Sequence, residues 1–467
     1  MIEDRATPAD AAELALRDED GAITSAFVDK AAALLAAGDR AALVELTQDL
    51  HEADVGSLLE ALDPEERPRL IELLGEDFDF AALTEVDDSV REEILEELEP
   101  QTVAEGVRDL DSDDAVYILE DLDEADKAEI LEKIPASERI ALQRSLDYPE
   151  GSAGRRMQTE VIAAPPFWTV GQTIDYLRET RDLPETFYEI YVVDPAHRLI
   201  GAVALDKLLR TKRPVKLLSL ADPERRTVEA TDELPYVAHL FQRYNLVSAP
   251  VVDEGERLVG VMTIDDVVDI IDEEAEEDIK ALGGVKSDEE FSDAVPSIAR
   301  SRFQWLFVNL LTAFVAAAVM KLFEASLEKM VALAVLAPIV ASQGGNAATQ
   351  TMTVAVRALA TGELGSANIS RFFTRELLVA CMNGTAFALI TGALAAIWFG
   401  NWGLGLVIGM AMIANLLAAA MGGAAIPVLL HRLKIDPAVS SGTFVTTVTD
   451  VVGFFAFLGI ATLWFGL

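Results

Sequence analysis

Residues 439–465 read VSSGTFVTTVTDVVGFFAFLGIATLWF, an apolar run in which Asp450 is the single charged residue. About 20 apolar residues in a helix cross the roughly 30 Å hydrocarbon core of a bilayer, so this run predicts a membrane span. A charged side chain at that depth costs about 2.5–3.5 kcal/mol or more. We therefore expect Asp450 to face a water-filled cavity or a cation. The alternative is a protonated carboxyl group that is hydrogen-bonded within the helix bundle.

Four further apolar runs of sufficient length precede this one, which gives an α-helical membrane domain with five spans. The predicted spans are Phe303–Phe323, Val331–Leu359, Glu376–Phe399, Leu404–Leu430 and Val439–Phe465. Basic residues gather at the ends that lie on the side of the N-terminus: Arg300, Arg302, Arg357, Arg371, Arg375, Arg432 and Lys434. The opposite ends carry Lys321 and Lys329. The positive-inside rule then predicts a multi-pass protein of the cell (inner) membrane with a cytoplasmic N-terminus and an external C-terminus.

The two parts of the chain differ sharply in charge. Residues 1–300 hold 29 basic and 73 acidic residues, a net charge of −44, whereas residues 301–467 hold eight basic and six acidic residues. So acidic a part argues against a nucleic-acid partner, which needs clustered Lys and Arg. The single Cys381 excludes a disulfide framework and Cys-based metal sites. The acids either attract cations or form a well-solvated, salt-adapted surface.

The cytosolic part divides by composition into two domains and a connector. We expect a flexible tail over residues 1–25 and an acidic, all-α helical-repeat N domain over 26–147, because short apolar helical motifs recur there and must stack to bury their stripes. Residues 148–271 contain a duplicated strand–helix–strand–strand–helix unit, with IYVVDPAHRLIGAVALDKLL (190–209) matching APVVDEGERLVGVMTIDDVV (249–268). This α/β tandem resembles a CBS pair. A connecting, plug-like helix is expected over 272–300 and the membrane domain over 301–467.

The second span has an unusual polar centre, APIVASQGGNAATQ (337–350). Pro338, Gly344 and Gly345 weaken a helix, and Asn346 adds an amide at membrane depth. Non-helical backbone at membrane depth is tolerated where it lines a cavity or is buried in protein. We therefore expect the second span to be interrupted at these residues. Glycine pairs also occur where helices cross closely, which is the alternative reading.

Three motifs, GGNAATQ, RALATGEL (357–364) and DPAVSSGTFVTTVTDVVG (436–453), closely resemble the MgtE family of magnesium channels. The domain order matches as well. The resemblance implies a homodimer whose central pore passes Mg²⁺ down its electrochemical gradient. It places the pore acid at Asp450 and a second-span polar residue at Asn346; Thr446, one turn before Asp450, is a further pore candidate.

The same resemblance implies that intracellular Mg²⁺ bound to cytosolic acids closes the pore. The matching positions are Asp266, Glu274, Glu277 and Asp278, with Glu105 and Asp109 as looser candidates in the N domain. Glu274, Glu277 and Asp278 share one helical face, where their mutual repulsion would be relieved by a divalent ion. Asn245 stands where the family can offer an acid. An ordinary solvated surface is the alternative for all these acids.

The second CBS copy carries Thr263 and Asp265 in GVMTID (260–265), which resembles the stretch that holds an adenosyl ribose and phosphate. The first copy has Ala204 in place of Thr263 and keeps Asp206, so we expect one site for ATP or another adenine nucleotide rather than two. A helix cap is the alternative role for these residues.

The sequence thus predicts a Mg²⁺-selective channel for magnesium uptake and homeostasis, and not an enzyme. A proton- or sodium-coupled divalent cation transporter is the main alternative. An intramembrane aspartyl protease needs two carboxyl groups that share a proton, and Asp450 is the only acid far from both ends of a predicted span. An adenylate-sensing protein anchored by its spans would not need polar residues inside them. Selectivity among Mg²⁺, Mn²⁺ and Co²⁺ stays open, since all suit octahedral oxygen ligands.

Overall fold

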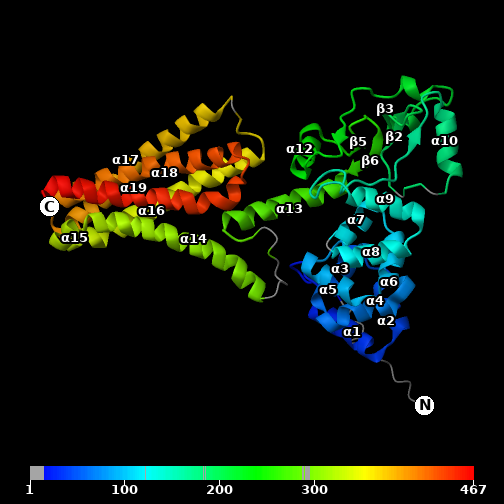
Figure 1. The fold of residues 1–467 in the computed structure, drawn as a ribbon, viewed down its shortest axis with the longest axis horizontal. Coiled ribbons are helices and arrows are strands. Elements are labelled where there is room, and N and C mark those ends of the chain that lie inside the picture. Colours follow the sequence, from blue (N-terminus) through cyan, green and yellow to red (C-terminus); the bar gives the residue numbers. More distant parts are fainter. Residues whose placement is uncertain are drawn as a thin grey trace, which may run out of the picture. The chain divides into compact units, whose positions relative to one another are not determined.

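A computed structural model describes residues 15–120, 122–181, 183–184, 186–286, 289, 295–365 and 367–467, without the side chains of 439–441. The chain forms two compact units, residues 1–272 and 273–467. Both appear in Figure 1, where colour follows the sequence. The predicted tail lies largely outside the described residues.

The N domain is a stack of short helices, as the recurring motifs predict. Its α-helices are α1 (Ser25–Ala37), α2 (Arg40–Thr47), α3 (Glu52–Ala61), α4 (Arg67–Leu74), α5 (Asp88–Glu97), α6 (Pro100–Arg108), α7 (Ser112–Glu120), α8 (Glu124–Lys133) and α9 (Ala136–Leu146). Three 3-10 turns lie among them: η1 (Pro64–Glu66), η2 (Gly75–Asp77) and η3 (Phe80–Leu83). Side-chain caps start several helices; the Thr24 hydroxyl, for example, accepts from the backbone N–H of Phe27. One hydrophobic core runs through the stack, from Phe27 to Leu142.

The predicted duplication is present as two sheets of the same design. The first sheet has the order β1 (Ala163–Ala164), β2 (Glu189–Val193), β3 (Leu199–Ala204), and the second β4 (Val228–Glu229), β5 (Ser248–Val252), β6 (Leu258–Thr263). In both, the first pair is parallel, the second is antiparallel, and the register shifts near the end of the middle strand. The accompanying helices are α10 (Val170–Glu179), α11 (Leu205–Leu209), η4 (Leu217–Ser219) and α12 (Leu234–Tyr244). The CBS-like α/β class is therefore confirmed.

One helix, α13 (Ile264–Leu282), follows β6 directly and ends at Gly283 and Gly284. It crosses the expected boundary between the CBS pair and the connector. The next helix, α14, begins at Val295, inside the range predicted for the connecting helix; residues 287–288 and 290–294 lie outside the described part.

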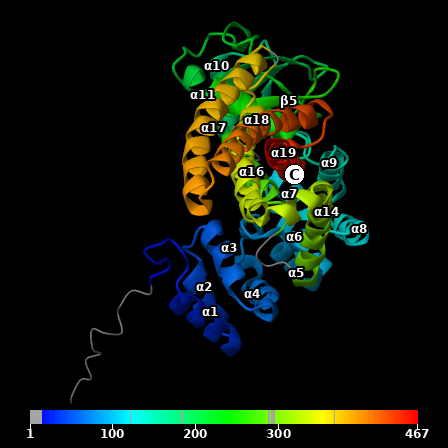
Figure 2. The same ribbon diagram turned by 90° about the vertical axis from the view of Figure 1, so that its left-hand side faces the viewer.

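In the described residues, five helices are long and apolar enough to cross a membrane. The long helices are α14 (Val295–Leu322), α16 (Val331–Ala360), α17 (Ile369–Phe399), α18 (Trp402–Arg432) and α19 (Pro437–Phe465), and α15 (Glu324–Lys329) joins the first two. Helix α18 packs against α16, α17 and α19. In both views α14 and α17 lie on opposite sides of the bundle, with α16, α18 and α19 between them (Figures 1 and 2).

The expected interruption of the second span is wrong, because α16 is one continuous helix with Pro338 inside it. Pro338 lies in the second turn, and proline is tolerated in membrane helices where neighbouring helices support the freed backbone groups. The glycines serve close packing instead: a Cβ on Gly344 would overlap the side chain of Asn415 on α18. The alternative reading, a close helix crossing, fits this position.

Candidate functional site

The pore candidates lie on two helices that pack against each other, α16 and α19. Asp450 is half-buried near the middle of α19, and Thr446 is exposed one turn earlier. Asn346 is exposed on α16. The Thr446 hydroxyl donates to the carbonyl of Gly442 at 2.8 Å, so its oxygen lone pairs remain available as acceptors. Carboxylate, amide and hydroxyl oxygens are thus supplied at the centre of these two spans.

Asn415 of α18 contacts both of the helices that carry the pore candidates. Its side chain lies against Gly344 of α16 and Gly453 of α19 at once. Gly344 is two residues from Asn346, and Gly453 is three residues, or nearly one turn, from Asp450. The candidate pore residues of the two helices therefore lie at similar depth in the bundle.

A group of acids lies between the N domain and the second CBS copy, within residues 1–272. We call it the N–CBS acid group: Glu85, Asp113, Asp114, Asp266 and Asp269. Burial and the charge of Asp266 raise the pKa of Asp113 well above its usual value, and the same causes raise the pKa of Asp114 to about 7. Burial raises the pKa of Glu85, and the charge of Asp269 raises it further. Burial and the charges of Asp272 and Asp265 raise the pKa of Asp269.

Asp266, predicted from sequence, is the centre of this group. Burial raises its pKa to about 6, although the Thr263 side chain and backbone donate hydrogen bonds that favour the charged form. Asp113 is 8% exposed, and among the described residues its buried Oδ1 has no hydrogen-bond partner. Buried acids that repel one another and an unsatisfied carboxylate oxygen suit a hard cation with oxygen ligands, such as Mg²⁺. Such an ion would relieve the repulsion among the carboxylates of this group.

The sequence prediction for the N domain selected other residues. Glu105 is exposed on α6 and accepts a hydrogen bond from Gln101 Nε2 at 2.6 Å, and Asp109 is exposed at the end of the same helix. Asp113 and Asp114 were missed, because their position in the first turn of α7 is typical of acids that merely interact with the helix dipole. Asn245 ends α12 with φ 51°, a left-handed conformation that asparagine tolerates.

A second acid group lies within residues 273–467. We call it the connector acid group: Glu274, Glu277, Asp278 and Asp436. Burial raises the pKa of Glu274 to about 7, with further contributions from the charges of Glu277 and Asp278. Burial and the charge of Asp436 also raise the pKa of Asp278. Asp436 was not predicted; its side chain caps α19 by accepting from the N–H of Ala438 at 2.7 Å.

The end of α13 is packed into the membrane bundle next to this group. Ala281 is 3% exposed and clusters with Ala348 and Met352 of α16, Ala419 of α18 and Val445 of α19. Val445 precedes Thr446, and Ala348 follows Asn346 by two residues. The connector acids and the pore candidates are thus joined through a small apolar cluster. No group of three or more His, Cys, Asp or Glu in the described ranges has direct metal-ligand geometry.

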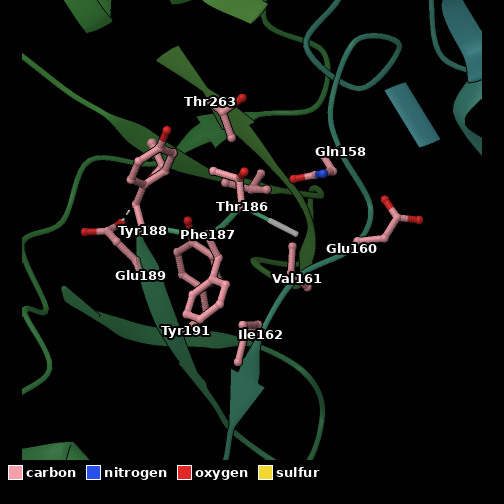
Figure 3. Close-up of a pocket in the computed structure, with 12 residues that line it drawn as sticks. Gln158, Glu160, Val161, Ile162, Thr186, Phe187, Tyr188, Glu189, Tyr191 and Thr263 are labelled. Atoms are coloured by element: carbon pink, nitrogen blue, oxygen red, sulfur yellow. Dashed lines mark hydrogen bonds between the residues drawn. The ribbon is translucent and has the colours of Figure 1, made fainter. Parts of the chain in front are cut away.

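A small, partly open pocket lies at the CBS pair (Figure 3). It is lined by Gln158, Glu160, Val161, Ile162, Thr186, Phe187, Tyr188, Glu189, Tyr191, Ser248, Val261 and Thr263. Aromatic side chains of the first copy and Thr263 of the second thus line the same pocket. Glu189, whose pKa burial raises, pairs with Arg225 at 2.9 Å. Thr263 was predicted for a nucleotide; Asp265 is exposed on α13 and is not among the lining residues.

Comparison with known proteins assigns these parts to one family. A family model described as a divalent cation transporter, MgtE, matches residues 337–460; the MgtE intracellular N domain matches 50–151, and a CBS domain matches 219–273. The magnesium transporter MgtE of Bacillus subtilis is 30% identical over 414 residues, covering 89% of this chain and 92% of that protein. The chain belongs to the MgtE family. The family assignment made from the sequence motifs is confirmed.

Two further relatives are similar over nearly the whole chain. The MgtE proteins of Thermus thermophilus and Enterococcus faecalis are each 33% identical and cover 91% and 90% of this chain and 96% and 93% of their own lengths. A crystal structure of the cytosolic domain of the Mg²⁺ channel MgtE in complex with ATP is 28% identical, covers 52% of this chain and 99% of its own, and gives a TM-score of 0.48.

Proposed function

We propose that this MgtE-family chain is a Mg²⁺-selective channel for magnesium uptake, built as a homodimer in the cell (inner) membrane. The observation that carries this proposal is the half-buried Asp450 at the middle of α19, in a bundle of apolar helices. One carboxylate from each chain, close to a two-fold axis, would attract a divalent cation into the bundle. The names of the curated relatives support Mg²⁺ as the ion.

The pore chemistry follows from the ion. Mg²⁺ gives up its water reluctantly and prefers six oxygen ligands at about 2.0–2.1 Å. Passage requires binding that is strong enough for entry and weak enough for release. Asp450 supplies charge, while Thr446 and Asn346 supply neutral oxygens for the hydration waters. A cage of several carboxylates would hold the ion too tightly, so a single acid in each chain suits rapid passage.

Closure by intracellular Mg²⁺ is the second part of the proposal. The N–CBS acid group and the connector acid group both contain carboxylates that are buried close to one another, as their raised pKa values indicate. Asp113, Asp114 and Asp266 would attract a hydrated ion to the first group, and Glu274, Asp278 and Asp436 would attract one to the second. A hydrated ion bound at the connector group would bridge its acids and so stabilise the position of Ala281 against α16 and α19. Low internal Mg²⁺ would restore the repulsion and free the inner end of the pore.

An adenine nucleotide is the proposed ligand of the pocket at the CBS pair. Phe187, Tyr188 and Tyr191 offer rings for stacking on a base, and Thr263 offers a hydroxyl to a ribose. The ligand is ATP or another adenine nucleotide, bound at one site in each CBS pair.

The proposed orientation places the N-terminus in the cytosol and the C-terminus outside. Arg357 at the end of α16, Arg371 and Arg375 at the start of α17, and Arg432 at the end of α18 lie at the ends assigned to the inner side.

The decisive experiment is flux through the full chain in proteoliposomes. Asp450→Asn should reduce voltage-driven Mg²⁺ flux to background while the protein stays folded, because the pore loses its charge. Glu363→Gln is the matched control, since Glu363 is an exposed acid at the inner end of the bundle. Normal flux in Asp450→Asn would remove the pore assignment. An obligatory requirement for a proton or sodium gradient in the unmodified protein would favour a coupled transporter.

A further inference from the structure

Asn415 is a fully buried amide at the centre of α18, whose other buried residues are apolar or small. Its Nδ2 donates to the carbonyl of Val340 on α16 at 2.8 Å. Its Oδ1 is also buried and, in the described part of the chain, has no hydrogen-bond partner. Burying an amide with one half unsatisfied is costly, and an apolar side chain would avoid that cost. Packing alone therefore does not explain this residue.

The surroundings of Asn415 are a notch made by two glycines. A Cβ on Gly344 of α16 would overlap Nδ2, and a Cβ on Gly453 of α19 would lie 2.7 Å from it. Neither glycine has a positive φ, so space rather than backbone conformation requires glycine at both positions. Three helices thus approach one another around a single side chain.

The contact is placed next to the proposed ion path. The carbonyl of Val340 belongs to the turn that leads to Gly344, and Asn346 follows two residues later. On α19, Gly453 is three residues from Asp450. Moving the amide therefore changes the relative depth of Asn346 and Asp450, although Asn415 itself faces neither the lipid nor solvent.

We propose that Asn415 is a positioning residue for ion selectivity: its amide fixes α16 and α19 so that Asn346 and Asp450 act on the same hydrated ion. This inference rests on the proposed pore. The hydrogen bond to Val340 fixes the position of α16, and the close fit against Gly453 fixes the position of α19. The cation preference of the pore then depends on a side chain that does not touch the ion.

The test compares rates and selectivity in purified full-length protein reconstituted in liposomes. Asn415→Leu keeps the number of side-chain heavy atoms and removes the donor; we expect folded protein with the Mg²⁺ to Ca²⁺ flux ratio reduced about tenfold, the change that about 1.4 kcal/mol in relative barrier height produces. Asn415→Asp keeps the shape but, when ionised, replaces the donor Nδ2 by a second acceptor oxygen, so the flux ratio should fall in this variant as well. A purely structural role would lower the yield or melting temperature and leave the flux ratio of folded protein unchanged, which would overturn the inference.

A glycine pair provides an independent readout that keeps Asn415 in place. Gly344→Ala creates the overlap with Asn415, whereas Gly345→Ala adds its Cβ where nothing lies within 4 Å. The first should reduce the flux ratio and the second should not. In an Asn415→Ala background Gly344→Ala should have little further effect, because the two residues act through one contact. Equal effects of the two alanines in the unmodified protein would contradict the proposed contact.

Failure of the positioning role of Asn415 can be distinguished from failure of the pore assignment. If Asp450→Asn conducts normally, the proposed function fails whatever Asn415 does. If Asp450→Asn is inactive and Asn415→Leu keeps both rate and flux ratio, the positioning role alone fails.

Discussion

The hydroxyl of Thr263 donates a 2.6 Å hydrogen bond to Oδ2 of Asp266 at the first turn of α13. Thr263 also lines the pocket at the CBS pair, and Asp266 belongs to the N–CBS acid group. Thr263, which is proposed to contact a nucleotide, is therefore hydrogen-bonded to Asp266, which is proposed to sense Mg²⁺. A ligand that engages one of them changes the hydrogen bonding or charge of the other.

Asp266→Asn should weaken inhibition by internal Mg²⁺ and raise the concentration for half inhibition about tenfold, which corresponds to about 1.4 kcal/mol of binding. The substitution removes a charge from the N–CBS acid group but retains an oxygen that can accept from Thr263. The measurement is Mg²⁺ current in excised patches against internal Mg²⁺. Glu254→Gln, which removes one exposed charge from the same CBS copy, is the control and should behave as the unmodified protein. Identical curves for both variants would exclude Asp266 from the sensor.

Replacing Glu274, Glu277 and Asp278 together by their amides should leave the current open at millimolar-scale internal Mg²⁺. These carboxylates are proposed to attract the ion that holds the closed position, so without them internal Mg²⁺ would no longer stabilise closure. The three exposed acids Glu65, Glu72 and Glu76 of the N domain, changed to glutamine together, provide a charge-matched control. Full inhibition in the connector variant would exclude the connector acid group from closure.

The N–CBS arrangement should become more stable as the pH falls. The pKa of Asp114 is raised from 3.8 to about 7 and that of Asp266 to about 6, so the folded state binds these protons more tightly than the unfolded chain. The stability from protonation is fully present below pH about 3.8 and is lost as the pH rises through 6 to 7. Mg²⁺ competes with these protons. The increase in melting temperature caused by Mg²⁺ should therefore be larger at pH 8 than at pH 6.

The check is thermal unfolding of the full chain in detergent, at both pH values, with and without Mg²⁺. Asp114→Asn combined with Asp266→Asn should flatten the pH dependence of the Mg²⁺ effect. An effect of Mg²⁺ that is as large at pH 6 as at pH 8 would show that these carboxylates do not hold the ion.

Thr263→Val should reduce binding of an adenine nucleotide, measured by calorimetry, by about tenfold, the equivalent of one hydrogen bond to a ribose. The substitution keeps the volume of the side chain and removes the hydroxyl at the pocket. Comparison of ATP, AMP and adenosine reports whether phosphates contribute. Unchanged affinity in Thr263→Val, with normal binding by the unmodified protein, would make the hydroxyl a helix cap alone.

The sequence predicted the parts of this fold whose signals are local. Span lengths and the duplicated CBS unit follow from hydropathy and from paired motifs, and both are confirmed by five long apolar helices and two matching sheets. The interruption expected around Pro338 was wrong because helix propensities measured in water overstate the effect of proline and glycine inside a packed membrane bundle.

The site residues were harder to predict, because burial of an acid depends on contacts between distant segments. Asp113 and Asp266 are more than 150 positions apart, and nothing near Asp113 in the sequence distinguishes it from the many other acids of the N domain. Asn415 was missed for a related reason: a single amide within an apolar span has no pattern, and its role follows from two glycines on other helices.

Helix α13 contains neither glycine nor proline from Ile264 to Leu282. Its first turn follows Thr263 at the edge of the pocket, and its last turn holds Ala281 among residues of α16, α18 and α19. At 1.5 Å per residue the element is about 28 Å long. Because no residue of α13 favours a bend, we expect a change at Thr263 to be transmitted along the helix to Ala281, and so to reach the proposed pore from the proposed nucleotide site.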